Sequence, residues 1–169
     1  MNQEEIERRI QEGRNSLKPL IEEETDYQSD QDLKKPQPPL VKEAMTSNII
    51  ALPTDFDHLT IDNDFLHVIN TRQSHRVYTQ QKMSLLELSY LLWCTQGVKE
   101  IRGKSYATLR TVPCGGARHE FECYMVIQNV DGLKDGYYHY LPMHHQIEML
   151  KEDRDLHDFI SVSLQKQDW

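Results

Sequence analysis

The segment from Ser84 to Gly97 constrains the fold of this chain more than any other part of the sequence. Ser84 and Glu87 have the Ser-x-x-Glu spacing of a capping box, in which each side chain satisfies a backbone amide at a helix start. The apolar run that follows predicts a largely buried helix, and it comprises Leu85, Leu88, Leu91 and Leu92 with Tyr90 and Trp93. Gly97 suits a left-handed cap at the end of this helix.

The rest of the chain alternates helical and strand-like segments. Further helices are predicted for residues 3–17, for a segment that begins near Thr60 or Asp62, and for residues 153–164. Strands are predicted for residues 48–52, 121–130, 136–140 and 146–150, with residues 121–130 as a buried strand. Residues 141–145 would link the last two strands as a hairpin-like meander.

Residues 18–48 form a contrasting segment that is acidic and contains Pro36, Pro38 and Pro39. Proline fixes φ and lacks an amide donor, so this composition favours extended or polyproline-like chain. We therefore expect an arm that is ordered only where it lies on another surface.

Length and charge limit the classes of protein to consider. The 169 residues fit one domain, and the net charge of −8 argues against general binding to nucleic acid or to anionic membranes. No apolar run approaches the ~20 residues that span a bilayer, and the charged N-terminus does not match a secretory signal, so we expect a cytoplasmic protein. Its three widely spaced cysteines, Cys94, Cys114 and Cys123, are expected to be reduced thiols.

Within this acidic chain, two windows contain no Asp or Glu. Residues 65–86 carry Arg72, Arg76 and Lys82, and residues 101–119 carry Arg102, Lys104, Arg110 and Arg118. Each window includes turn-forming residues, and together they predict a site for an anionic ligand.

The first window contains Arg72-x-Ser74-x-Arg76. Two guanidinium groups and a hydroxyl can surround a phosphate or a polar ring edge, because arginine donates in a fixed fork. The alternative is a solvated helix end, where cations interact favourably with the helix C-terminus.

The second window leads into the stretch from Thr108 to Val130, whose centre is the small-residue turn Pro113-Cys114-Gly115-Gly116-Ala117. Glycines let a ligand approach the backbone closely, and the turn matches neither a P-loop nor Gly-x-Gly-x-x-Gly. The functional interpretation is a loop that faces a cofactor, and the alternative is an ordinary turn that leads into a strand. Cys114 is either a nucleophile activated by nearby cations or a small residue that fills a tight turn.

His139, His144 and His145 are candidate metal ligands by residue type. No carboxylate or cysteine joins them at a diagnostic spacing, so no metal site is expected.

Four segments in this order resemble the SagB/ThcOx-type dehydrogenases, a branch of the nitroreductase superfamily that uses flavin mononucleotide (FMN). They are the Arg-x-Ser-x-Arg segment, LLWCTQGV, LRTVPCGGARHEFECYMVI and GLKDGYYHYLP, and the resemblance covers roughly residues 52–150. It implies an α+β fold, with a mainly antiparallel sheet surrounded by helices, and two protomers that share each flavin site.

The resemblance also implies roles for individual residues. Arg72, Ser74 and Arg76 match the segment that contacts the ribityl phosphate and ring edge, and Pro113, Cys114, Gly115 and Gly116 match the loop beside the isoalloxazine. Family members pass hydride equivalents through the flavin, and some oxidise azoline rings in peptides, so a small-molecule or peptide substrate is implied. No catalytic residue is assigned.

Two departures from the family pattern modify this expectation. Cys114 stands where the family usually has serine, and a further stretch with core helices and cations is not found after residue 169. We therefore expect residues 1–52 to form a helix and arm, and residues 53–169 the N-terminal part of a nitroreductase-like domain. The alternative is a truncated or split, non-catalytic family member that needs a partner chain to complete the fold.

Overall fold

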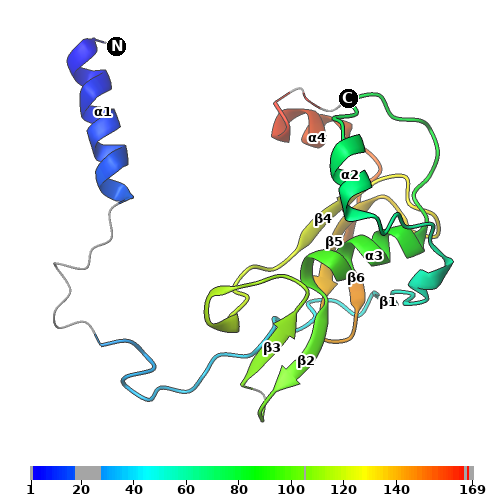
Figure 1. The fold of residues 1–169 in the computed structure, drawn as a ribbon, viewed down its shortest axis with the longest axis horizontal. Coiled ribbons are helices and arrows are strands. Elements are labelled where there is room, and N and C mark those ends of the chain that lie inside the picture. Colours follow the sequence, from blue (N-terminus) through cyan, green and yellow to red (C-terminus); the bar gives the residue numbers. More distant parts are fainter. Residues whose placement is uncertain (1, 18–27, 105, 166, 168–169) are drawn as a thin grey trace. The chain divides into compact units, whose positions relative to one another are not determined.

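The computed structural model describes residues 2–17, 28–104, 106–165 and 167, and it divides the chain into two compact units (Figure 1). Residues 1–38 form the first unit and residues 39–169 the second. Of the arm predicted at residues 18–48, the structure describes residues 28–48, and residues 18–27 lie outside the described residues.

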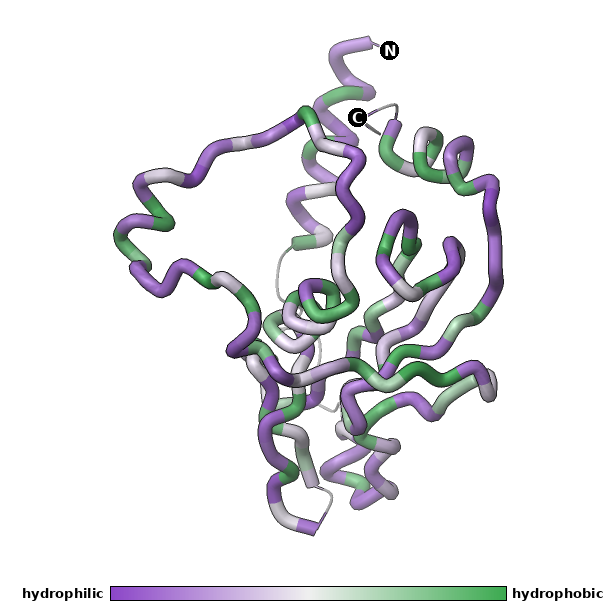
Figure 2. Tube along the Cα trace, turned by 90° about the vertical axis from the view of Figure 1, so that its right-hand side faces the viewer, coloured by the Kyte–Doolittle hydropathy of each residue, from purple (hydrophilic) through white to green (hydrophobic). Residues whose placement is uncertain are grey.

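The first unit contains helix α1 (Gln3–Ser16), which confirms the predicted N-terminal helix. Asn2 caps it by accepting a hydrogen bond from the Glu5 amide at 2.8 Å, and Glu5 pairs with Arg8 and Arg9 at 3.0 and 2.9 Å. None of its described residues is buried, and Figure 2 shows how few apolar residues it carries. Capping and neighbouring ion pairs therefore stabilise α1 in place of core packing.

The second unit is built on a four-stranded antiparallel sheet with the strand order β1-β6-β5-β4. Its strands are β1 (Ile49–Ala51), β4 (Tyr124–Ile127), β5 (Gly136–Leu141) and β6 (Gln146–Glu152). A separate antiparallel ribbon pairs β2 (Val98–Arg102) with β3 (Ala107–Arg110). With the helices around these strands, the predicted α+β fold is confirmed.

The helices of this unit are short except for α3. They are α2 (Phe65–Thr71), α3 (Leu85–Gln96) and α4 (His157–Ser163), with the 3-10 turns η1 (Phe56–His58) and η2 (Gly115–Ala117). Among the described residues, none of the helices has the length and apolar character that crossing a bilayer requires.

Helix α3 begins as predicted, because the capping box of Ser84 and Glu87 is fully formed. Its end differs from the prediction, since Gly97 has φ −59° and is not in the left-handed region. The reason for glycine here is space: a Cβ on Gly97 would lie 2.4 Å from Cε3 of the Trp93 ring.

The hydrophobic core lies between α3 and the sheet. Leu88 and Leu92 of the helix pack with Tyr138, Tyr140 and the other core residues, which are Leu52, Ile127, Val130 and Ile147. His139 and Glu148, on the same two central strands, are also fully buried. Both faces of β5 are therefore covered, one by the core and the other by residues 42–46 of the predicted arm, whose main chain contacts Glu122 and Glu148.

Several predicted boundaries change in the structure. The strand expected at residues 121–130 is limited to β4, and it is an edge strand with Tyr124 and Val126 exposed. Helix α2 begins later than predicted because Asp64, not Thr60 or Asp62, is its N-cap. Helix α4 is shorter than the predicted 153–164.

Candidate functional site

The Arg-x-Ser-x-Arg segment follows helix α2. Arg72 is the C-cap residue of this helix, and its amide donates to the Val68 carbonyl at 3.0 Å. Ser74 and Arg76 lie in the loop that follows, and all three side chains are exposed. Within the described part of the chain, these three side chains form no hydrogen bond or ion pair, so their donors are available to an anionic ligand.

Helix α2 presents this segment without packing into the core. Phe65, Leu66 and Ile69 are 77%, 67% and 54% exposed, and no residue of the helix is buried. A group of large apolar side chains with this exposure is uncommon on the surface of a monomer.

The second predicted segment begins at a buried cation. Arg110, the last residue of β3, is 7% exposed, and its Nε and Nη1 donate to Thr108 Oγ1 at 3.2 Å and Gln96 Oε1 at 2.8 Å. Both acceptors are neutral, and among the described residues Arg110 has no carboxylate within salt-bridge distance. Burial lowers the pKa of Arg110, although the charge of Glu122 opposes that effect. Buried charges are normally paired, so the buried guanidinium of Arg110 favours an anionic ligand at this turn.

The turn after Arg110 is open on its glycine side. Gly116 has φ +63°, a conformation that favours glycine, and a Cβ built on Gly115 meets no heavy atom within 4 Å. Pro113, Gly115 and Gly116 are exposed, which leaves their backbone accessible to a planar ligand.

Cys114 holds this turn together through its sulfur. Its thiol donates to Glu120 Oε2 at 3.2 Å, and Sγ accepts the His119 amide, also at 3.2 Å. These contacts favour the interpretation of Cys114 as a turn-forming residue, and no described histidine side chain pairs with it as a base would.

The structure does not bring the two predicted segments together. No hydrogen bond, ion pair or ring contact within the described residues joins Arg72, Ser74 or Arg76 to residues 113–116. In Figure 1 the loop after α2 leads to the N-terminal end of α3, whereas η2 follows the β2–β3 ribbon beyond the other end of that helix.

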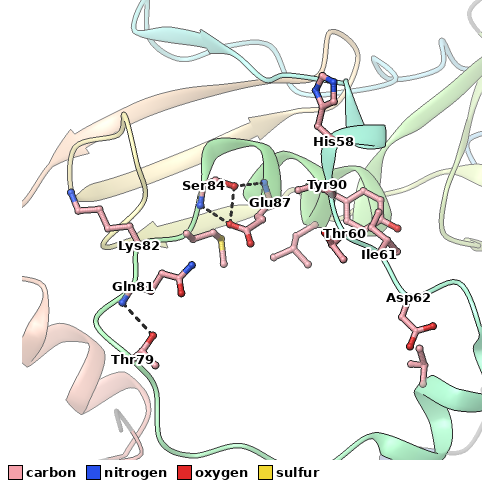
Figure 3. Close-up of a pocket in the computed structure, with 14 residues that line it drawn as sticks. His58, Thr60, Ile61, Asp62, Thr79, Gln81, Lys82, Ser84, Glu87 and Tyr90 are labelled. Carbon is pink, nitrogen blue, oxygen red and sulfur yellow. Dashed lines mark hydrogen bonds between the residues drawn. The ribbon is translucent and has the colours of Figure 1, made fainter.

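A cavity of about 920 Å³ lies beside the first segment and contains none of the predicted site residues (Figure 3). Its walls come from four separate parts of the chain: residues 58–62, Val68 of α2, residues 79–84 and the first two turns of α3. Lys82 and Asp62 supply opposite charges at its two sides (Figure 3). Sequence reasoning missed this cavity because no local pattern connects these parts.

The three candidate metal ligands among the histidines occupy different environments. His139 contacts two carboxylates, His145 contacts Ser89 and Tyr140, and His144 is exposed. In the part of the chain that the structure describes, no group of three metal-ligating side chains occurs.

His145 belongs to a buried hydrogen-bond chain with a defined direction. The Ser89 hydroxyl donates to the Pro53 carbonyl, so its oxygen accepts from His145 Nε2 at 2.7 Å. Nδ1 is then the acceptor for the Tyr140 hydroxyl, also at 2.7 Å. Burial lowers the pKa of His145, which agrees with this neutral imidazole.

Comparison with known proteins shows which proteins this chain is similar to. No family model matches the chain. The chain is 30% identical over 117 residues to the protein named "Putative nitroreductase MJ1384" of Methanocaldococcus jannaschii, which covers 69% of this chain and 54% of the relative. A crystal structure of a "putative nitroreductase" from Ralstonia eutropha JMP134 shares 26% identity, with a TM-score of 0.47, over 69% of this chain and 50% of its own.

The chain thus spans about half the length of the relatives it matches. In sequence, the chain is similar to a nitroreductase-type protein over about half of that protein's length. This similarity does not distinguish the SagB/ThcOx branch from others.

Proposed function

We propose that this protein is an FMN-dependent oxidoreductase of the nitroreductase superfamily, or the flavin-binding part of one. The observation that carries the proposal is the buried Arg110, which has no carboxylate partner among the described residues, beside the open turn at Gly115 and Gly116. Sequence similarity to a nitroreductase-type protein, over a span that includes most of the second unit, supports the same class.

The donor set fits the chemistry of flavin mononucleotide. Arg72, Ser74 and Arg76 would bind the phosphate and ribityl chain, because two arginine forks and a hydroxyl match phosphate oxygens. Pro113, Cys114, Gly115 and Gly116 would lie beside the isoalloxazine ring. Bound flavin would supply hydride transfer, and nearby cations would stabilise negative charge on its ring.

The substrate, the reaction and the oligomeric state are further parts of this proposal. The SagB/ThcOx resemblance favours a small-molecule or peptide substrate, with oxidation of an azoline-type ring as one candidate reaction. Because the two cofactor segments are apart in one chain and α2 exposes apolar side chains, we propose that a homodimer assembles each site.

A flavin titration tests the proposal. FMN fluorescence should be quenched on binding, and Arg72→Ala/Arg76→Ala should raise the Kd at least ~10-fold, equivalent to about 1.4 kcal/mol. The matched control is Arg8→Ala/Arg9→Ala, which removes the same charge from α1 in the other compact unit. No binding by the wild type, or equal Kd values for the two double variants, would contradict the proposal.

The second candidate is a non-catalytic member that needs a different partner chain. The exposed apolar face of α2, formed by Phe65, Leu66 and Ile69, favours it as much as it favours a homodimer. Light scattering of the purified chain with FMN separates the two. A dimer that retains flavin supports the enzyme, and a flavin-free monomer or aggregate supports the partner-dependent member.

A further inference from the structure

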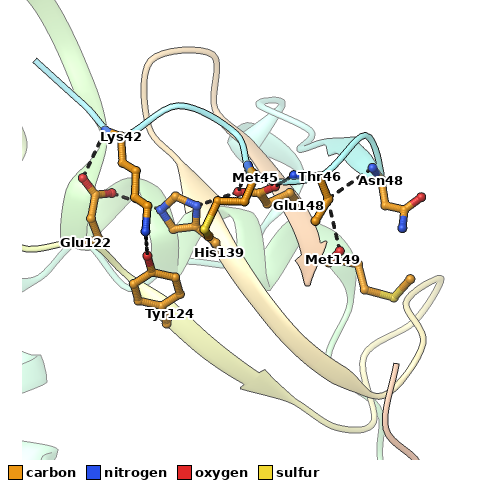
Figure 4. Close-up of polar contacts among 9 residues, drawn as sticks. All are labelled: Lys42, Met45, Thr46, Asn48, Glu122, Tyr124, His139, Glu148 and Met149. Carbon is orange, nitrogen blue, oxygen red and sulfur yellow. Dashed lines mark hydrogen bonds and ion pairs between the residues drawn. The ribbon is translucent and has the colours of Figure 1, made fainter. Parts of the chain in front are cut away.

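Residues 41–46 form a strap across the face of the sheet that does not meet the core. Figure 4 shows Lys42, Glu122 and Tyr124 at one end of the strap, Met45, Thr46 and Glu148 at the other, and His139 between them. The strap therefore crosses directly over a cluster of titratable groups.

One end of the strap is held by a buried carboxylate. Glu148 is 0% exposed, and its Oε2 accepts the amides of Met45 and Thr46 at 2.8 and 2.6 Å. Its Oε1 contacts His139 Nδ1 at 2.8 Å. A buried carboxylate with this many donors is stable in its charged form and positions the strap main chain.

The other end is held by a second carboxylate on the same imidazole. Glu122 Oε1 accepts the Lys42 amide at 3.2 Å, and Oε2 contacts His139 Nε2 at 3.0 Å. The Lys42 ammonium donates to the Tyr124 hydroxyl at 2.8 Å, and the Tyr124 ring stacks on His139 with centroids 4.7 Å apart. Both ends of the strap thus depend on one histidine.

The strap also encloses a cavity of about 390 Å³. Four of its residues line one side, and the opposite side is mainly apolar, formed by Ile49, Leu141, Met143, His144 and Gln146. Movement of the strap would therefore open an apolar surface that is covered when the carboxylates hold its main chain.

We propose that residues 41–46 act as a lid that the negative charge of Glu148 holds closed, and that neutralising this charge releases the lid while the sheet stays folded. The charged and titratable groups that face Glu148 are His139 on β5, Glu122 before β4, Tyr124 on β4 and Lys42 on the strap. None of them can replace the two hydrogen bonds that Met45 and Thr46 give to the carboxylate.

The acid dependence has a defined sign. Burial acts to raise the pKa of Glu148, but hydrogen bonds from His139 and from the Met45 and Thr46 amides outweigh it, so the pKa lies below its ordinary 4.5. Closure is therefore complete above pH 4.5 and is lost as the pH falls through the lower, folded-state pKa.

Amide hydrogen exchange of the full chain tests the proposal. Glu148→Gln keeps the shape and removes the charge, and it should increase exchange of the Met45 and Thr46 amides at least ~10-fold, or about 1.4 kcal/mol. Amides of β5 should keep their wild-type rates. The matched control is Glu152→Gln on the same strand, whose carboxylate binds Lys134 and Arg154 and not the strap.

Two results would overturn the proposal: strap amides that exchange at the wild-type rate in Glu148→Gln, or strap and β5 amides that accelerate together as in global unfolding. Acidification of the wild-type protein provides a second measurement if the variant fails to fold. After correction for intrinsic exchange, the strap should open below pH 4.5 before β5 does, and simultaneous opening counts against the lid.

Discussion

Replacing Ser89 by alanine tests whether the buried hydrogen-bond chain stabilises the second unit. Ser89 is 0% exposed, and its hydroxyl is the shared partner of His145 Nε2 and the Pro53 carbonyl. Ser89→Ala would leave the buried His145 Nε2 and the half-buried Pro53 carbonyl without this partner, and such a loss costs about 1–3 kcal/mol for a fully buried group and less for a half-buried one. Alanine favours the helix by up to ~0.7 kcal/mol, so we expect a net loss of roughly 1–4 kcal/mol.

Urea unfolding followed by Trp93 fluorescence and far-UV circular dichroism measures this loss. Trp93 is a suitable reporter because its ring lies 5.8 Å from that of His145. The control is Thr95→Ala on the same helix, whose exposed residue donates only to carbonyls of the preceding turn and should change stability by less than about 0.5 kcal/mol. A Ser89→Ala loss below about 1 kcal/mol, or equal to that of the control, would refute the reasoning.

Three further outcomes follow from the structure. The urea midpoint should fall as the pH drops below 6.5, because the unfolded state protonates His145 more readily than the folded state does. It should fall further below pH 4.5, because the unfolded state also protonates Glu148 more readily, and Glu148→Gln should remove only this second decline. Gly136→Ala should destabilise by more than about 2 kcal/mol in the same assay, because its Cβ would lie 2.2 Å from the Lys151 carbonyl oxygen, and a wild-type midpoint would contradict this. Gly115→Ala should leave the midpoint within ~0.5 kcal/mol but weaken FMN binding in a fluorescence titration, whereas an unchanged Kd would argue against a ligand at this turn.

The parts of the fold that the sequence predicts well are those with local signals. The capping box at Ser84 and Glu87 predicts the start of α3, and the strands at residues 136–140 and 146–150, with the link at 141–145, predict the β5–β6 hairpin. The sequence does not predict the β2–β3 ribbon, because β2 is largely exposed and β3 buries the polar Thr108 and Arg110, so neither strand has an apolar period. Gly103, with φ +63°, is a weak signal for the turn between them.

Predictions that depended on burial were less accurate. Residues 121–130 predict a buried strand, but among the described residues β4 pairs with β5 alone, and Phe121 and Val126 are exposed. The predicted arm does lie on another surface at residues 42–46. Its anchors, Glu122 and Glu148, are distant in sequence and carry charge, so neither pattern nor hydropathy identifies them.

For the candidate site, residue types were more predictable than their arrangement. The cations at Arg72, Arg76 and Arg110 were found from the absence of nearby acids, and the structure shows that only Arg110 is buried. The assembly of the two segments into one flavin site stays a prediction, because it depends on contacts that one chain does not form.

The strand order also determines when the N-terminal part of the second unit can fold. Strands β5 and β6 are joined by four residues and can pair as soon as both exist, whereas β1 pairs only with β6, where Ile50 lies opposite Ile147. The loop between β1 and β6 runs from Ala51 to Gln146, and pairing of these two strands requires that this long loop be closed. Such non-local pairing is typically slow. On the ribosome, β1 and the Met45–Thr46 end of the strap therefore emerge early but cannot dock until β6 has been synthesised, so the beginning of this unit must wait for a strand near its end.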